Sequence, residues 1–225
     1  MDFQKYLECN FNYEEPILTE ELRDKLNINP NTLRQNLKKA TDNGMITRYA
    51  LKAGIYYRPN PKPLFRSSLS LDSVLKKKYL FDAANHRIGY VTGLSFANDL
   101  GLTTQNALAY EIVTNKEKMS SRKVIYGKSS VFLMKPKTLV TTRNYKLLQI
   151  FDLISSFEYY SEQRIEDSMG KYLDYLRDLN ISWEEIKKYL SAYSERAQLA
   201  IYRSDLVYEL ASKQRTFQGS HSRSI

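Results

Sequence analysis

Polar and basic side chains recur along one face of a helix that the sequence predicts from Pro30 to about residue 43. Leu33, Leu37 and Ala40 recur at the spacing of a buried helical face, so the side chains between them point into solvent. Lysine and arginine bind the phosphates of nucleic acids, and asparagine, glutamine and arginine hydrogen-bond to base edges. We therefore expect a DNA-contacting face made of Asn31, Thr32, Arg34, Gln35, Lys38 and Lys39.

A β-hairpin is predicted immediately after this helix. Two runs, residues 45–50 and 55–58, flank a short turn that contains Gly54, which is the pattern of two paired strands. A basic two-stranded wing contacts the DNA backbone or the minor groove in several DNA-binding folds. The basic side chains expected to make such contacts here are Arg48, Lys52 and Arg58.

The segments before this helix supply its supporting elements. Apolar side chains at helical spacing in residues 6–11 predict a first helix, and Thr19 is a candidate N-cap for a second. Asn29, which precedes a proline, starts the third helix, and Gly44 ends it. Three helices and a basic hairpin within residues 1–75 predict an N-terminal winged helix-turn-helix. A winged helix can also serve as a protein-interaction module, which is the alternative.

The positive charge of the chain is concentrated in the same region. The 225 residues carry a net charge of +9, and residues 29–78 alone are net +9. Residues 1–28 are net −4, residues 79–149 net +6 and residues 150–225 net −2. A concentrated basic stretch is typical of nucleic-acid binding proteins. The alternative is a solvated basic surface without a nucleic-acid partner.

Residues 76–225 are expected to form a second, mixed α/β domain with helices in its C-terminal part, so that the whole chain is α+β. Apolar spacing predicts a helix over residues 89–101. The predicted strands are 108–113, 123–126 and 131–134, the last two joined as a hairpin. Asn144 is a candidate N-cap of a further helix, and Ser182 with Glu185 has the pattern of a capping box.

Few features of the chain suit catalysis or cofactor binding. Residues 122–129 end like a phosphate-binding loop, but Arg122 stands where the first glycine belongs, and a strand follows instead of a helix. One cysteine and two histidines supply too few ligands for a Cys- or His-based metal site. We therefore predict no enzymatic activity, no cofactor and no metal. No apolar run is long enough to span a membrane and no export signal opens the chain, so we expect a cytoplasmic protein without a membrane partner.

Two segments of the second domain resemble a known family. They are Gly89-Tyr90-Val91-Thr92-Gly93-Leu94-Ser95-Phe96-Ala97-Asn98-Asp99-Leu100-Gly101-Leu102-Thr103-Thr104-Gln105 and Glu111-Ile112-Val113-Thr114-Asn115. These segments resemble the antitoxins of the bacterial abortive-infection type IV toxin–antitoxin systems. The order of winged helix, Gly-Leu-Thr-Thr-Gln block, hairpin and helices is similar as well, and the resemblance covers about residues 15–155.

The resemblance implies an antitoxin of phage defence that represses its own operon by binding inverted repeats in the promoter, which is double-stranded DNA. It also implies that the C-terminal domain counteracts a co-encoded nucleotidyltransferase toxin. Loops held by a rigid scaffold often carry function, so we expect the short polar loop of Thr103, Thr104 and Gln105 to contribute to antitoxin function. The alternative is that these residues only cap and join the neighbouring elements.

Two other functions are compatible with the same residues. A winged-helix regulator without antitoxin activity would use its second domain to sense a ligand or to dimerise. An enzymatic antitoxin would transfer phosphate to its toxin. A nucleotidyltransferase gene beside this one would favour the antitoxin over the plain regulator.

Overall fold

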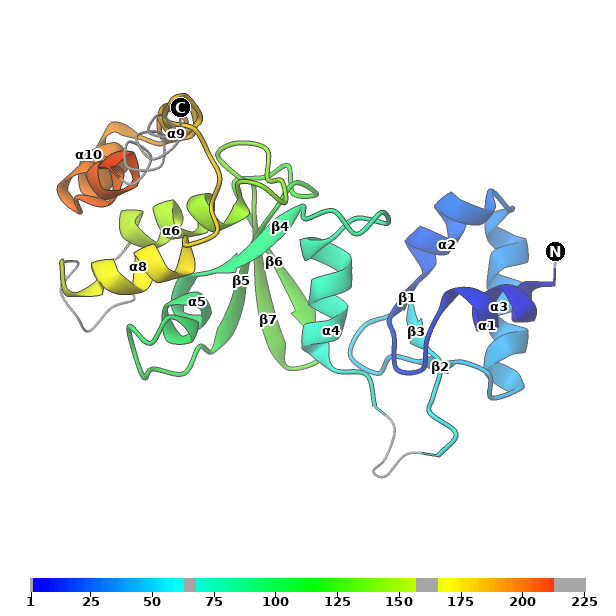
Figure 1. The fold of residues 1–225 in the computed structure, drawn as a ribbon. Coiled ribbons are helices and arrows are strands. Elements are labelled where there is room, and N and C mark those ends of the chain that lie inside the picture. The colour runs from blue at the N-terminus through cyan, green and yellow to red at the C-terminus, as the bar shows by residue number, and fades with distance from the viewer. Residues whose placement is uncertain (1, 63–67, 157–165, 213–225) are drawn as a thin grey trace, which may run out of the picture. The chain divides into compact units, whose positions relative to one another are not determined.

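The computed structural model describes residues 2–62, 68–156 and 166–212. Both parts of the chain contain helices and strands, so the fold is mixed α+β, as the sequence predicts (Figure 1). The chain divides into two compact units. Unit 1 comprises Met1–Asn85 with Ile125–Ser129, and unit 2 comprises His86–Val124 with Ser130–Ile225.

Three helices and a short sheet form most of unit 1. The helices are α1 (Phe3–Asn10), α2 (Thr19–Leu26) and α3 (Pro30–Asp42). The strands are β1 (Ile17–Leu18), β2 (Thr47–Arg48) and β3 (Ile55–Tyr57), in the antiparallel order β1-β3-β2. The two strands of the expected hairpin are therefore present but shorter, and β1 is a third strand that the sequence did not predict. Helix α4 (Leu71–Leu75) and the π-helical turn η1 (Lys76–Leu80) follow.

Helix α3 has the predicted start and end. Asn29 Oδ1 accepts a hydrogen bond from the backbone N–H of Asn31 at 2.9 Å, and Gly44 follows the helix with a left-handed φ of 71°. Its apolar face packs into a core that joins the helices to the sheet. The buried residues of this core are Leu7, Phe11, Ile17, Leu22, Leu33, Leu37, Ala40, Ile46 and Tyr56. The polar side chains of α3 consequently face solvent.

The start of α2 differs from the prediction. Leu18 is the N-cap position and Thr19 is already the first helical residue. Strand β1 runs directly into α2, so the Thr19 hydroxyl donates to the carbonyl of Gly54 at 2.9 Å instead of capping the helix. Thr19 thus ties α2 to the turn of the hairpin.

A four-stranded sheet of order β4-β5-β7-β6 belongs to unit 2 except for the ends of β6 and β7 at their connecting turn, which are assigned to unit 1. Its strands are β4 (Gly89–Thr92), β5 (Ala109–Thr114), β6 (Ser121–Tyr126) and β7 (Ser129–Met134). Strand β4 is antiparallel to β5, with Tyr90 opposite Val113 and Thr92 opposite Glu111, whereas β5 is parallel to β7. The three predicted strands and the turn that joins the last two are confirmed.

The predicted helix over residues 89–101 is wrong in its first part. Its first four residues form β4, and α5 (Gly93–Asp99) begins only after them. Short apolar runs do not distinguish a strand from a helix, and here pairing with β5 decides for the strand. Gly93 makes the turn into the helix with a φ of 68°, and a Cβ atom there would lie 2.5 Å from the Glu111 carboxyl group. Only glycine fits this position without displacing Glu111.

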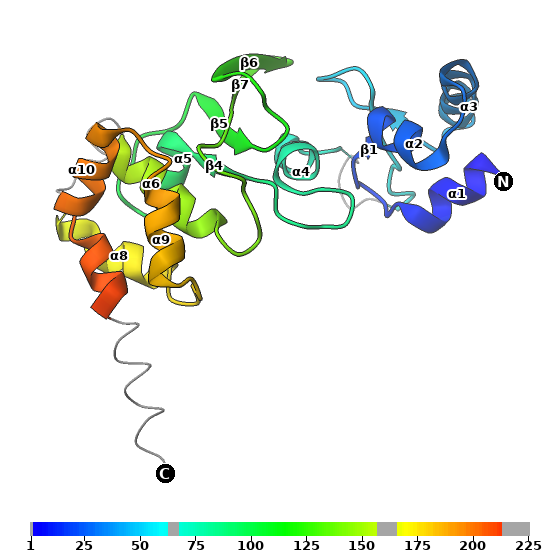
Figure 2. The same cartoon turned by 90° about the horizontal axis from the view of Figure 1, so that it is seen from above.

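Helices gather beside this sheet in unit 2 (Figure 2). Helix α6 (Tyr145–Ser155) packs on β4, and α10 (Glu195–Arg203) packs on α6. The remaining described helical segments are η2 (Glu166–Ser168), α8 (Met169–Tyr175), α9 (Trp183–Leu190) and residues 206–212. Their apolar side chains and those of the sheet form one core, in which Phe151 and Tyr172 are fully buried.

Two predicted caps in unit 2 have different outcomes. The capping box of α9 is confirmed, because Ser182 Oγ accepts from the Glu185 N–H and the Glu185 carboxylate accepts from the Ser182 N–H. Asn144 does precede α6, but its side chain does not cap the helix. It instead accepts from the Thr141 N–H at 2.8 Å and donates to the Leu139 carbonyl at 2.9 Å.

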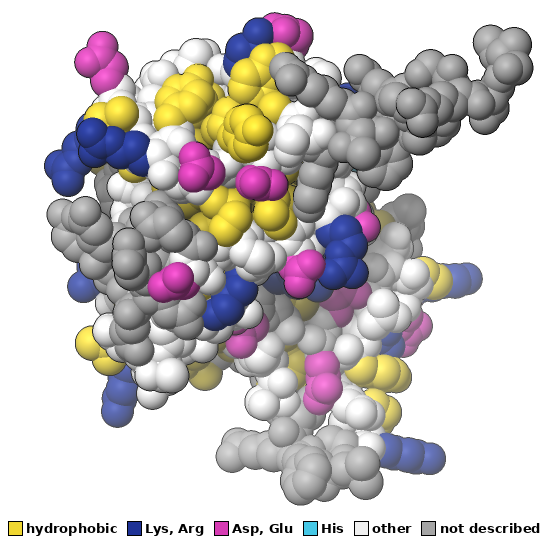
Figure 3. Space-filling view, turned by 60° about the vertical axis from the view of Figure 1, so that its left-hand side comes forward, with side chains coloured by type: hydrophobic (Ala, Val, Ile, Leu, Met, Phe, Trp, Pro, Cys, Tyr) yellow, Lys and Arg dark blue, Asp and Glu magenta, His cyan; other side chains and the backbone are white. Residues whose placement is uncertain are grey.

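Some large apolar side chains are exposed on the helical side of unit 2. They include Leu199 and Tyr202 on α10 and Tyr208 just after it, and Figure 3 shows hydrophobic side chains gathered on this face. Among the described residues, no helix has the length and apolar character that crossing a membrane requires.

Candidate functional sites

The polar face of α3 is open to solvent along its whole length. The exposed residues include all six that were predicted to contact DNA: Asn31, Thr32, Arg34, Gln35, Lys38 and Lys39. Arg34 donates from Nη1 to Asn31 Oδ1 at 3.3 Å. Within the described ranges, none of the three cations on this face forms an ion pair. Their charges are therefore available for an external anion such as phosphate.

The three basic residues of the hairpin have more varied surroundings. Arg48 is exposed on β2, with its guanidinium 6.0 Å from the centre of the Tyr56 ring. Lys52 donates to the Ile125 carbonyl at 3.2 Å, and Arg58 donates to the Phe11 carbonyl at 2.8 Å. Arg48 thus presents its charge to solvent, whereas Lys52 and Arg58 are held by contacts inside unit 1.

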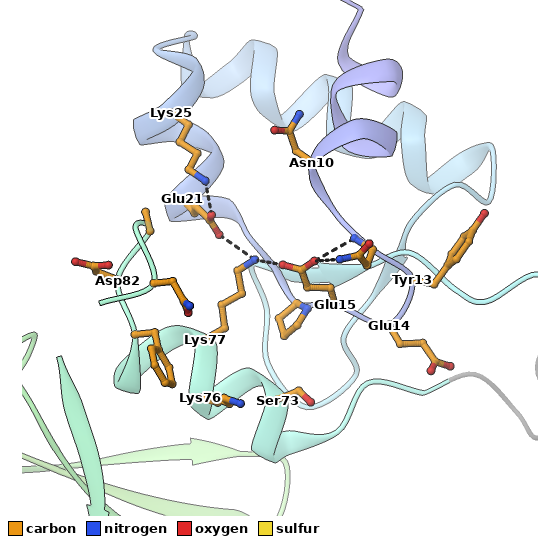
Figure 4. Close-up of a pocket in the computed structure, with 15 residues that line it drawn as sticks. Asn10, Tyr13, Glu14, Glu15, Glu21, Lys25, Ser73, Lys76, Lys77 and Asp82 are labelled. Atoms are coloured by element: carbon orange, nitrogen blue, oxygen red, sulfur yellow. Dashed lines mark hydrogen bonds and ion pairs between the residues drawn. The ribbon is translucent and has the colours of Figure 1, made fainter. Parts of the chain in front are cut away.

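A pocket of about 560 Å³ in unit 1 contains many charged side chains (Figure 4). Lys77 Nζ lies 2.6 Å from Glu15 Oε1 and 3.6 Å from Glu21 Oε2. Lys25 Nζ lies 2.9 Å from the other oxygen of Glu21. In the close-up these side chains point toward one another from α2, η1 and the segment that follows α1. The network joins the acidic first part of the chain to the basic turn η1.

The shifts of two pKa values indicate that the lysines and carboxylates of this network stabilise each other's charged forms. Burial alone would raise the pKa of Glu15, but Lys77 and the hydrogen bonds from Asn12 outweigh it, and the pKa is lowered. The Glu21 carboxylate raises the pKa of Lys25. Lys78 also pairs with Glu20, at 3.4 Å. Part of the positive charge of residues 29–78 is therefore compensated by residues 1–28 and is not available to DNA.

The loop of Thr103, Thr104 and Gln105 follows α5 in unit 2. Thr103 is buried, and its Oγ1 accepts from the Gln105 N–H at 3.1 Å. The Gln105 carbonyl accepts from Asn98 Nδ2 at 3.1 Å, while the Thr104 and Gln105 side chains are exposed. Thr103 therefore stabilises the turn, and only the other two side chains can reach a partner.

One polar cluster in unit 2 was missed by the sequence analysis. Asp152 on α6 accepts from the Tyr90 hydroxyl at 2.6 Å and from the Tyr193 hydroxyl at 2.9 Å. Burial raises the pKa of Asp152, although the two hydroxyls and Lys137 act in the opposite direction. Burial, together with Asp152, raises the pKa values of Tyr90 and Tyr193 well above their usual range, so both remain protonated donors. No sequence motif connects these residues, which are 62 and 41 positions from Asp152.

Comparisons with known proteins add no further constraint on these sites. The chain matches no family model, no curated protein and no solved structure. In the part of the chain that the structure describes, no group of three or more His, Cys, Asp or Glu residues could hold a metal ion. The function therefore has to be argued from the sites themselves.

Proposed function

We propose that unit 1 is a winged helix-turn-helix that binds double-stranded DNA, with α3 as the recognition helix. The observation that carries this proposal is the exposed face of α3, on which Arg34, Lys38 and Lys39 form no ion pair among the described residues. Asn31 and Gln35 on the same face supply amides that can hydrogen-bond to bases. Positive charge and base-reading groups thus share one helical surface.

The dimensions of unit 1 agree with this proposal. Helix α3 has 13 residues, which corresponds to a length of about 20 Å, enough to lie in a major groove. The turn between β2 and β3 is the wing, and Arg48 is the exposed cation beside it. Lys52 and Arg58 act mainly by stabilising the wing, because their side chains are held inside unit 1.

The whole chain, on this proposal, is an autorepressing antitoxin that neutralises a nucleotidyltransferase toxin. The support is the resemblance of residues 89–105 and 111–115 to type IV antitoxins. In the structure the first four residues of one segment, β4, pair with β5 in the other, from Gly89 opposite Thr114 to Thr92 opposite Glu111. The two segments that carry the resemblance are therefore joined by paired strands of unit 2.

DNA binding is tested by a band shift with DNA from the promoter of this gene. The double variant Arg34→Ala with Lys38→Ala should bind at least about thirtyfold more weakly, because each lost contact is worth roughly 1–3 kcal/mol. A matched control, Lys5→Ala with Lys188→Ala, removes two exposed lysines elsewhere and should bind almost normally. Unchanged binding by a folded α3 variant would contradict the assignment of α3.

Antitoxin function is tested by co-expression with the nucleotidyltransferase encoded beside this gene. The chain should restore growth, and Thr104→Ala with Gln105→Ala should lower this rescue while a promoter reporter stays repressed. The α3 variant should do the reverse. Absence of rescue by the unaltered chain would leave a plain regulator, and transfer of radiolabelled phosphate to the toxin would indicate an enzymatic antitoxin.

A further inference from the structure

Unit 2 contains a pocket of about 380 Å³ that neither the DNA interface nor the Thr103–Gln105 loop uses. Lys135 and Lys137, which follow β7, and Arg196 on α10 line it with exposed side chains. Across the residues that the structure describes, none of these three cations lies within ion-pair distance of a carboxylate. Three positive charges at one pocket without such a partner are an arrangement that suits an anionic group.

Hydrogen-bonding side chains line the same pocket. Asp152 lines it, partly buried, with each carboxylate oxygen accepting one tyrosine hydroxyl. A carboxylate oxygen has a second lone pair, so Asp152 can accept further hydrogen bonds from a ligand. Ser194 Oγ accepts from the Ala197 N–H at 3.4 Å, which leaves its hydroxyl proton for a ligand. Asp152 and Ser194 therefore favour a partner that carries hydroxyl groups.

The wall beside Asp152 is formed by the strands that carry the resemblance. Thr92 on β4 and Glu111 on β5 both line the pocket and are paired directly with each other. The Glu111 carboxyl group occupies the space that Gly93 leaves open. The pocket thus combines hydrogen-bond acceptors with exposed cations, and Lys137 lies near enough to Asp152 to lower the pKa of that carboxyl.

From this combination of cations and hydrogen-bonding groups we infer that the pocket binds a phosphorylated sugar, as found in sugar phosphates and nucleotides. Lys135, Lys137 and Arg196 hold the phosphate, and Asp152 and Ser194 hydrogen-bond to the sugar hydroxyls. The volume lies within the range of small-molecule sites and exceeds what a lone phosphate would fill. Binding here is separate from DNA binding, because the pocket and α3 belong to different units.

The test is calorimetric titration of the full chain with four probes: ribose 5-phosphate, AMP, inorganic phosphate and ribose. We expect saturable binding of ribose 5-phosphate or AMP, at least tenfold tighter than that of inorganic phosphate or ribose. Absence of saturable binding of both phosphorylated sugars would overturn the inference. Equal affinity for inorganic phosphate would overturn it as well, because the sugar would then contribute nothing.

Variants locate the binding in this pocket. Lys137→Ala with Arg196→Ala should weaken binding of the phosphorylated sugar at least tenfold. The control Lys188→Ala with Arg203→Ala removes exposed cations from α9 and α10 and should retain it. Arg34→Ala with Lys38→Ala should also retain it, which excludes adsorption to the DNA-binding face. Weakening by either of these control pairs to the same extent would overturn the assignment.

The role of Asp152 needs a separate variant. Asp152→Asn keeps the side-chain shape but removes a negative charge, so inorganic phosphate should bind at least as tightly, whereas the affinity for ribose 5-phosphate relative to inorganic phosphate should fall at least fivefold. Thermal unfolding followed by circular dichroism verifies that the variant is folded. An unchanged ratio of the affinities for ribose 5-phosphate and inorganic phosphate in folded Asp152→Asn would contradict the sugar contact. Failure of any of these ligand tests would leave the band-shift result for α3 unaffected.

Discussion

In the pocket of unit 1, Lys77 lies 2.6 Å from Glu15 and Lys25 lies 2.9 Å from Glu21. In the pocket of unit 2, by contrast, Lys135, Lys137 and Arg196 form no ion pair among the described residues, although Asp152 lines the same pocket. Both pockets contain lysines and carboxylates. They differ in whether those charges are close enough to form ion pairs among the described residues.

This difference separates charges whose ion pairs stabilise the fold from charges that are available to bind a ligand. A partly buried lysine in an ion pair has lost hydration and gained contact with a carboxylate. Replacing that lysine therefore leaves the carboxylate without its cation. An exposed, unpaired lysine keeps its hydration and contributes little to stability. The same composition can therefore have a structural role in unit 1 and a binding role in unit 2.

The largest expected effect concerns Gly93, which holds the turn beside the pocket of unit 2. Gly93→Ala should lower the free energy of unfolding by about 2–3 kcal/mol. The alanine would have to adopt a left-handed φ, and its Cβ atom would contact the Glu111 side chain. Gly44→Ala has the left-handed φ but open space around it and should cost about 1–2 kcal/mol. Chemical denaturation measures both.

The contact with Glu111 can be isolated in a double-mutant cycle. In a Glu111→Ala background, Gly93→Ala should cost about as much as Gly44→Ala, since only the backbone conformation is then unfavourable. Gly170→Ala, at a helical glycine with open space and no left-handed φ, should instead be neutral or raise the free energy of unfolding by up to about 1 kcal/mol. An equal cost for Gly93→Ala in both backgrounds would show that Glu111 does not limit this position.

An intermediate effect is expected at Lys77. Lys77→Ala should lower the free energy of unfolding by about 1–3 kcal/mol, because Glu15 and Glu21 lose their shared cation. The neighbouring Lys76→Ala and the pocket variant Lys137→Ala should each change it by less than about 0.5 kcal/mol. Urea unfolding followed by circular dichroism distinguishes them. Comparable losses for Lys77 and Lys137 would remove the contrast between the pockets.

The smallest effects are expected in the pH dependence of stability. The pKa of Glu15 is lowered in the folded chain, so its contribution is present above the unfolded pKa and is lost as the pH falls through the folded pKa. Glu15→Gln should therefore cost about 1 kcal/mol or less at pH 7 and less still near pH 3. Unfolding followed by circular dichroism at the two pH values measures this change.

Asp152 should show the opposite sign. Its pKa is raised, so the folded chain holds the proton more tightly, and stability falls as the pH rises from the unfolded to the folded pKa. The free energy of unfolding of Asp152→Asn, relative to that of the unaltered chain, should therefore be higher at pH 7 than at pH 3. The single tryptophan, Trp183, lies on α9, so its fluorescence reports the unfolding of unit 2. If the stability effects of Glu15→Gln and Asp152→Asn changed with pH in the same direction, the contrast between these two carboxyl groups would be contradicted.

Local signals in the sequence predicted much of the fold. The cap of α3 at Asn29, its end before Gly44 and the capping box at Ser182 are all confirmed. Each depends on contacts between residues no more than a few positions apart, so a short stretch of sequence contains all the required information. The exposed face of α3 follows from the same helical periodicity.

Other features depend on partners that are distant in the sequence. Residues 89–92 are a strand because β5 pairs with them, and Thr19 bonds to Gly54 because β1 joins the sheet. Asp152 meets Tyr90 and Tyr193 only after α6 packs on β4. Local sequence propensity does not predict these contacts, because hydrogen bonding and apolar burial between segments that are distant in the sequence create them. Local residue patterns determine most of the order of helices and strands, whereas the pocket of unit 2 forms only when segments distant in the sequence pack together.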